Sequence, residues 1–179
     1  MEKKENDIRK VVFSALLLAL AVVLPILTGQ IPQIGNLLLP MHIPVLLCGY
    51  VCGCPWGLIV GLCAPILRAL IFNVPVLWPT AIAMAVELAA YGALAGFMYK
   101  RLPKTSGWIC LELVIAMLVG RLLWGAAVWI IAAATGEEFT FAIFFETTIT
   151  MAIPGIVIQL VLIPLLVTEL QKAKLILND

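Results

Sequence analysis

Long apolar runs separated by short polar stretches dominate this sequence. Cutting the chain at prolines, glycines and charged residues leaves six apolar segments. A hydrocarbon core of about 30 Å needs roughly 20 residues of helix, and most of these segments reach that length. The pattern predicts helices at about 8–27, 41–53, 55–72, 78–99, 107–134 and 142–169.

Composition and the distribution of charge turn this pattern into a topology. Hydrophobic residues make up 64% of the 179 residues and charged residues only 12%, against roughly 25% charged in a typical globular domain. With a cytoplasmic N-terminus, nine of the eleven Lys/Arg lie inside and none lies in an outer loop. The positive-inside rule therefore predicts cytoplasmic termini. These inside cations are Lys3, Lys4, Arg9, Lys10, Lys100, Arg101, Lys104, Lys172 and Lys174.

We therefore expect an all-α membrane protein with six transmembrane helices, folded as one integral-membrane domain over residues 1–179. We expect the lipid bilayer to surround this domain. The formal net charge of +1 gives no reason to expect a nucleic-acid partner.

The second predicted helix is too short to cross a bilayer alone. About 13 residues span roughly 20 Å, so the uncharged segment 28–41, "TGQIPQIGNLLLPM", must dip inward or the helix must lie deep in the bundle. Irregular backbone at membrane depth has to line a cavity or be covered by protein. We predict that this segment covers an outer pocket, with Gln30, Gln33 and Asn36 as its polar side chains.

His42, the only histidine, stands between Pro40 and Pro44 at the start of this helix. Proline is tolerated in the first turn of a helix, which places the helix start at about Ile43. His42 is either a latch between the covering segment and the solute, or a residue that only caps the helix.

Four ionisable residues fall inside predicted spans. Each costs roughly 2.5 to 3.5 kcal/mol at the bilayer centre, so such groups face the bundle interior and mark function or pairing. One reading is two structural ion pairs, such as Glu87 with Arg121. The other is a solute site, which with nearby polar and aromatic side chains consists of His42, Arg68, Asn73, Glu87, Arg121, Trp124 and Glu146.

Two further patterns have a structural and a functional reading. Ala15 and Ala19 share one helix face, as in small-xxx-small faces that let membrane helices approach closely. They serve either internal packing or docking on another membrane subunit. Cys48, Cys52 and Cys54 resemble a soft-metal set, but small apolar filler is the preferred reading. We predict no metal site and no catalytic residue, and G-x-x-x-x-G-K-[ST] does not occur.

The chain resembles the substrate-binding S components of energy-coupling factor (ECF) vitamin transporters. The resemblance rests on "ALLLA", "LPMHIPVLL", "GCPWGLIVGLCAP" and "WPTAIAMAVELAAYG", in this order, and on the size with six helices. It implies high-affinity binding of a vitamin or precursor near the outer face of a prokaryotic plasma membrane. It also implies docking through Ala15 and Ala19 on a transmembrane coupling (T) subunit driven by two cytoplasmic ATPases. The chain itself would then need no cofactor, because the partners use the ATP.

The sequence does not determine the identity of the solute, and pantothenate-like, pyridoxine-like, folate-like and corrinoid solutes are all compatible with it. A self-sufficient, ion-coupled carrier is the second reading, because Glu87 and Glu146 could relay protons. An intramembrane enzyme is a distant third.

Overall fold

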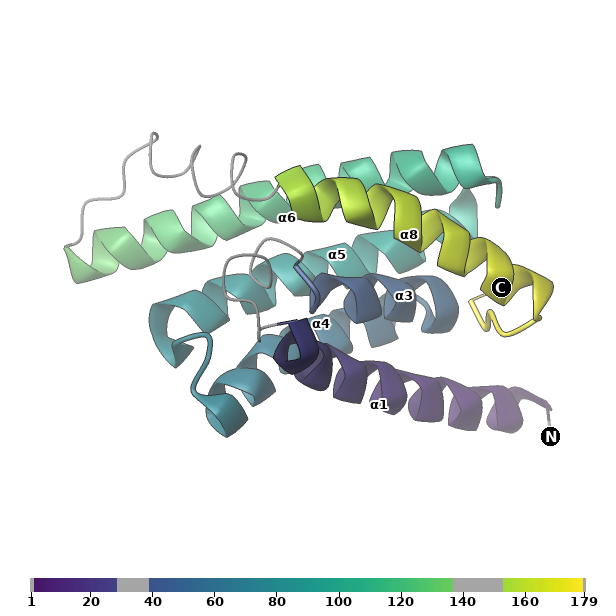
Figure 1. Cartoon of the computed structure of the whole chain (residues 1–179), viewed down its shortest axis with the longest axis horizontal. Helices are drawn as coiled ribbons and strands as arrows, with labels where there is room; N and C mark the ends of the chain where they lie inside the picture. The colour runs from purple at the N-terminus through teal and green to yellow at the C-terminus, as the bar shows by residue number, and fades with distance from the viewer. Residues whose placement is uncertain (1, 29–38, 137–152, 179) are drawn as a thin grey trace.

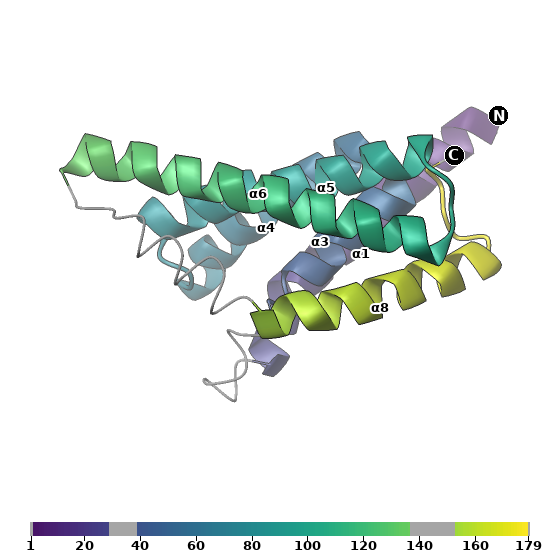
Figure 2. The ribbon, with the colours of Figure 1, turned by 90° about the horizontal axis from the view of Figure 1, so that it is seen from above.

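The computed structural model describes residues 2–28, 39–136 and 153–178, and the regular elements within these ranges are helices. Figure 1 shows one bundle, with α6 and α8 along one side, α1 along the other, and α3, α4 and α5 between them. The two chain ends lie at the same end of the bundle, as Figure 2 also shows. The elements are α1 (Glu2–Thr28), α3 (His42–Cys52), α4 (Cys54–Phe72), the π-helical turn η1 (Leu77–Ala81), α5 (Ile82–Arg101), α6 (Ser106–Thr135) and α8 (Ile153–Lys172).

Five stretches in the described ranges are long and apolar enough to cross a membrane, where the sequence predicted six. The exception is α3, whose 11 residues extend about 16 Å. Gly53 ends this helix with φ 98°, a conformation that favours glycine. The five candidate spans are Lys4–Ile26, Cys54–Phe72, Leu77–Arg101, Ser106–Thr135 and Gly155–Lys172.

The short helix α3 occupies the centre of the bundle. Nine of its 11 residues are buried, and it packs against α1, α4, α5 and α8. Its apolar side chains form much of the core, with Leu46 and Tyr50 fully buried. Because neighbouring helices surround α3, it has no need to reach both surfaces of the membrane.

Helices α3, α4 and α5 meet at three glycines. A Cβ atom at Gly57 would overlap the carbonyl of Gly92, and a Cβ atom at Gly49 would overlap the same carbonyl. Gly92 of α5 thus lies against both α3 and α4, and the three helices approach one another closely at this point.

Two predicted helix starts differ from the structure. The predicted helix at 8–27 is α1, which already begins at Glu2. The predicted helix at 78–99 is α5, which begins at Ile82, because Trp78 has the extended angles φ −117° and ψ 128° inside η1. The predicted helix at 142–169 contains most of α8 (Ile153–Lys172). Residues 142–152 of that prediction lie outside the described ranges.

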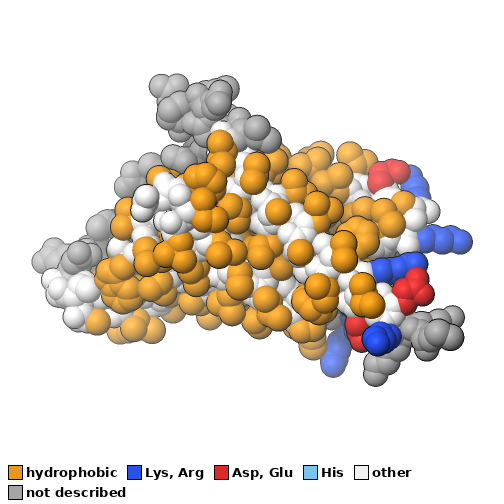
Figure 3. Space-filling view, turned by 90° about the horizontal axis from the view of Figure 1, so that it is seen from below, with side chains coloured by type: hydrophobic (Ala, Val, Ile, Leu, Met, Phe, Trp, Pro, Cys, Tyr) orange, Lys and Arg blue, Asp and Glu red, His pale blue; other side chains and the backbone are white. Residues whose placement is uncertain are grey.

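The described surface is mostly apolar, and its charged side chains gather at one end. Figure 3 shows hydrophobic side chains over most of the face, with Lys, Arg, Asp and Glu gathered at the end where the termini lie. Large apolar side chains point outward, for example Val161 at 68% and Leu122 at 65% exposure. Apolar outer faces of this extent fit a lipid environment rather than water.

Candidate solute-binding site

The candidate site begins at the first turn of α3. The His42 backbone N–H donates to the Leu39 carbonyl at 3.0 Å, which closes the turn before the helix. Pro40, Met41 and Pro44 are buried around it. The His42 side chain is only 2% exposed. The sequence thus folds the segment before α3 so that its histidine points into the bundle.

A buried carboxylate from α5 lies beside this histidine. Glu87 is 1% exposed, and Tyr91, one helical turn later, donates its hydroxyl to Glu87 Oε1 at 2.9 Å. Residues four apart share a helix face, so α5 itself supplies this hydrogen bond. The same hydroxyl lies 3.5 Å from the Met117 carbonyl of α6.

Helix α6 adds a cation to the carboxylate. Arg121 Nη1 lies 3.1 Å from Glu87 Oε1, and the Arg121 side chain is 15% exposed. The preceding residue, Gly120, lies against the ring of Tyr91, which a Cβ atom at position 120 would overlap. The glycine therefore lets α5 and α6 approach closely enough for the ion pair to form.

The His42 side chain completes the group, although it forms no hydrogen bond with the described residues. Its Nε2 atom lies 3.9 Å from Glu87 Oε1, and its ring is 5.4 Å from the ring of Tyr91. Neither ring nitrogen has a hydrogen-bond partner among the described residues, and neither has Arg121 Nε. We call His42, Glu87, Tyr91 and Arg121 the polar cluster.

The polar cluster lies away from the charged end of the bundle. His42 begins α3, whose last residue, Cys52, borders a recess near the termini. Glu87 precedes Lys100, in the last turn of α5, by 13 residues, or about 20 Å. The cluster therefore occupies the half of the bundle opposite the basic end.

The ion pair of Glu87 with Arg121 supports one of the two readings of the intramembrane charges. Each ion offsets part of the other's desolvation cost, so the pair holds α5 against α6. A purely structural pair does not account for His42, whose two ring nitrogens are buried and have no hydrogen-bond partner in the part of the chain that the structure describes. Buried polar groups normally find a partner, and one that does not calls for an explanation.

Two residues predicted for the site belong instead to the end of α4. Arg68 Nε donates to the Val74 carbonyl at 3.0 Å, and Asn73 ends the helix in the left-handed conformation, with φ 55°. Asn73 is exposed, and asparagine tolerates this conformation better than most residues. Among the described residues, neither side chain forms a hydrogen bond or an ion pair with the polar cluster.

Several predicted residues cannot be placed with the cluster. Trp124 is half-buried on α6, one turn after Arg121. The remaining predicted residues, Gln30, Gln33, Asn36 and Glu146, lie outside the described ranges.

Sequence reasoning missed three buried polar residues. Tyr91 follows Glu87 by four positions, a spacing that identifies it as a partner on the same helix face. Glu112 is a fifth ionisable residue within a predicted helix and is completely buried. Gln159 on α8 is 1% exposed. A polar residue inside an apolar span was the signal available for all three.

The two alanines of α1 lie on its outer face. Ala15 and Ala19 are exposed, as are the large neighbours Val12 and Leu16. The opposite face of α1 packs inward, where Ser14 lies 3.6 Å from the thiol of Cys48 on α3. The alanine face is thus not used for packing against the described part of this chain.

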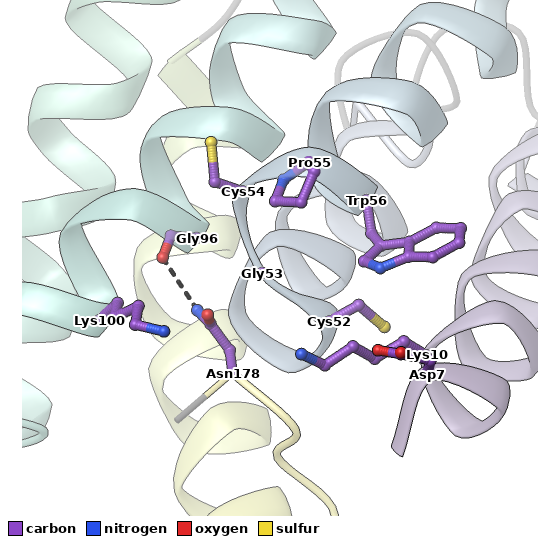
Figure 4. A pocket seen from close by; sticks show the side chains of 10 residues that line it. All are labelled: Asp7, Lys10, Cys52, Gly53, Cys54, Pro55, Trp56, Gly96, Lys100 and Asn178. Carbon is purple, nitrogen blue, oxygen red and sulfur yellow. Dashed lines mark hydrogen bonds between the residues drawn. The ribbon is translucent and has the colours of Figure 1, made fainter. Parts of the chain in front are cut away.

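A separate recess of about 310 Å³ lies at the basic end (Figure 4). The Asn178 amide borders it and donates to the Gly96 carbonyl at 2.9 Å, while the Leu177 backbone N–H donates to the Val51 carbonyl. The C-terminal segment is thereby tied to α3 and α5. The residues that line the recess are Asp7, Lys10, Cys52, Gly53, Cys54, Pro55, Trp56, Gly96, Lys100 and Asn178.

Comparison with known proteins agrees with the resemblance. The family model described as "ECF transporter, substrate-specific component" matches residues 9–176. No curated protein and no solved structure gives a significant match. The family match covers nearly the whole chain and all the helices described above. The chain therefore belongs to the substrate-specific components of ECF transporters.

Proposed function

We propose that this S component binds a small vitamin or vitamin precursor with high affinity at the polar cluster, from the outer side of the membrane. The observation that carries the proposal is a buried histidine whose ring nitrogens have no hydrogen-bond partner within residues 2–28, 39–136 and 153–178. It lies beside a buried ion pair, in the half of the bundle away from the basic end. Concave sites with a few fixed polar groups among apolar walls suit small, polar solutes.

The orientation follows from the charges. Lys10, Lys100 and Lys172 belong to the end where the termini lie, and the positive-inside rule makes that end cytoplasmic. The polar cluster then faces outward, and segment 28–41 connects α1 to His42 on the outer side. We retain Gln30, Gln33 and Asn36 as polar side chains of a segment that covers the bound solute.

Membership of the family implies a T subunit and ATPase subunits as partners. The exposed face of α1 offers a surface for the T subunit, since Ala15 and Ala19 would let a second helix approach closely there. Transport would use ATP hydrolysed by two cytoplasmic ATPases, with no cofactor and no catalytic residue in this chain.

Reconstitution tests this function directly. The purified chain in vesicles, with and without the T subunit and the two ATPases, is supplied with a mixture of metabolites, and mass spectrometry identifies what accumulates inside. We expect accumulation of a vitamin or precursor only when all subunits and ATP are present. Accumulation by this chain alone, driven by an ion gradient, would instead establish a self-sufficient carrier. Covalent change of the solute would establish an enzyme.

A further inference from the structure

The unsatisfied atoms of the polar cluster are all nitrogens. Glu87 Oε1 already accepts from Tyr91 and pairs with Arg121. Arg121 Nε and both ring nitrogens of His42 have no partner among the described residues. Arginine carries only donors, and a neutral histidine carries one N–H donor and one acceptor nitrogen. Arg121 Nε and one ring nitrogen of His42 can therefore donate to a solute with acceptor atoms.

The start of α3 adds positive potential at the same place. The N-cap residue of α3 is Met41, which makes no side-chain hydrogen bond to the helix, and the first turn holds no acidic residue. The first N–H groups of a helix carry a partial positive charge that favours anions. His42 is itself the first residue of α3, so this positive helix end and the buried histidine coincide.

The charge balance favours an anion over a cation. Among the described residues, Glu87 Oε1 lies 3.1 Å from Arg121 Nη1 and 3.9 Å from His42 Nε2, so the only carboxylate of the cluster already faces a cation. A cationic solute would have to displace Arg121 from Glu87 and leave the arginine buried without a counter-ion. An anionic solute requires no such exchange.

We infer that the solute of this S component carries a carboxylate, which binds between Arg121, His42 and the start of α3. The inference rests on the proposed function and narrows its substrate to acidic vitamins or precursors. Arginine is suited to this role because its planar guanidinium matches a carboxylate while one nitrogen stays on Glu87. His42 then supplies the second contact through a ring N–H.

Matched acid and neutral compounds test the inference. The probes are nicotinate with nicotinamide, pantothenate with panthenol, and biotin with biotinamide, each titrated calorimetrically into the purified chain in nanodiscs. We expect the acid of at least one pair to bind roughly tenfold or more tightly than its neutral counterpart, because charge-assisted hydrogen bonds are lost in the neutral compound. Arg121→Gln should abolish this preference, and Arg121→Lys should keep part of it.

Arg9→Gln is the matched control, because Arg9 is exposed on α1 and pairs with Glu5. It removes the same charge far from the cluster and should leave the preference for the acid unchanged. If no acid binds more tightly than its neutral counterpart, or if Arg121→Gln keeps the preference, the carboxylate inference is wrong. ATP-driven uptake of a neutral or cationic solute would also overturn it, while leaving the transport function intact.

Discussion

Replacing Glu112 by methionine should stabilise the protein. Glu112 lies on α6, is 0% exposed, and neither of its carboxylate oxygens has a hydrogen-bond partner among the described residues. The hydroxyl of the neighbouring Tyr50 donates to the Ile109 carbonyl at 3.5 Å and not to Glu112. The side chain therefore carries a desolvation cost that nothing described here offsets.

The size of the effect follows from this burial. A buried polar group without a partner costs about 1–3 kcal/mol. Glu112 is six residues after Ser106, the start of α6, or about 9 Å from the helix end, so the larger cost at the bilayer centre does not apply in full. Methionine has a similar length and helix propensity, and fills irregular space. For a chain of this size, we expect the melting temperature of Glu112→Met to rise by roughly 2 to 12 °C.

Thermal unfolding in nanodiscs, followed by tryptophan fluorescence, measures this change. The control is Glu169→Met, because Glu169 is exposed and its ion pair with Lys172 contributes little. A melting temperature of Glu112→Met equal to or below that of the wild type would refute the reasoning. It would show that the Glu112 carboxylate has a favourable partner in the membrane.

Gln159 is the described residue best placed to be that partner. Ser106 lies beside Thr168 at 3.5 Å, and Cys110 lies 4.0 Å from the Leu160 carbonyl. Helices α6 and α8 therefore run antiparallel, which puts Gln159 at about the level of Glu112. Comparing Glu112→Met, Gln159→Met and the double variant would measure a coupling energy between the two side chains.

Three further predictions concern docking, binding and packing. Ala15→Trp should block assembly with the T subunit and uptake while leaving solute binding by the isolated chain intact; normal assembly of this variant would refute the docking face. His42→Ala should weaken solute binding at least tenfold, or about 1.4 kcal/mol, mainly by faster release. Equal dissociation rates across pH 5.5 to 8 would leave His42 as a helix-start residue only. Gly57→Val should lower folding yield, because its Cβ atom would overlap the Gly92 backbone, whereas Gly107→Val meets nothing within 4 Å and should be tolerated.

The helical fold could be predicted because membrane helices depend on local properties. Apolar length and the breaks at prolines, glycines and charges are visible along the chain, and the described ranges are indeed all-helical. The start of α3 followed from Pro40 and Pro44 for the same reason. The convergence of α3, α4 and α5 on Gly92 could not be predicted, since it depends on how three helices rotate against one another.

The sequence marked His42, Glu87 and Arg121 singly, but it did not show that these residues lie together. The cost of an intramembrane charge marked Glu87 and Arg121, and their pairing was one of the readings. The same argument marked Arg68, but the Arg68 side chain lies at the end of α4, where its Nε donates to the Val74 carbonyl. The cost of burying a charge does not reveal which buried polar residues lie at the same depth in the bundle and can contact one another. That depends on the packing of α5 on α6, which Gly120 and Tyr91 determine.

The short central helix connects the fold to the site. If α3 crossed the whole membrane, its first residue would lie at the surface, and His42 would be hydrated like any interfacial side chain. Because α3 ends at Gly53 near the basic end and extends only about 16 Å, its N-terminus lies inside the bundle, at the level of Glu87. A helix start with no cap side chain can lie there only if other groups satisfy its N–H donors. In this chain the Leu39 carbonyl satisfies one of them, and an acidic solute beside Arg121 would satisfy others.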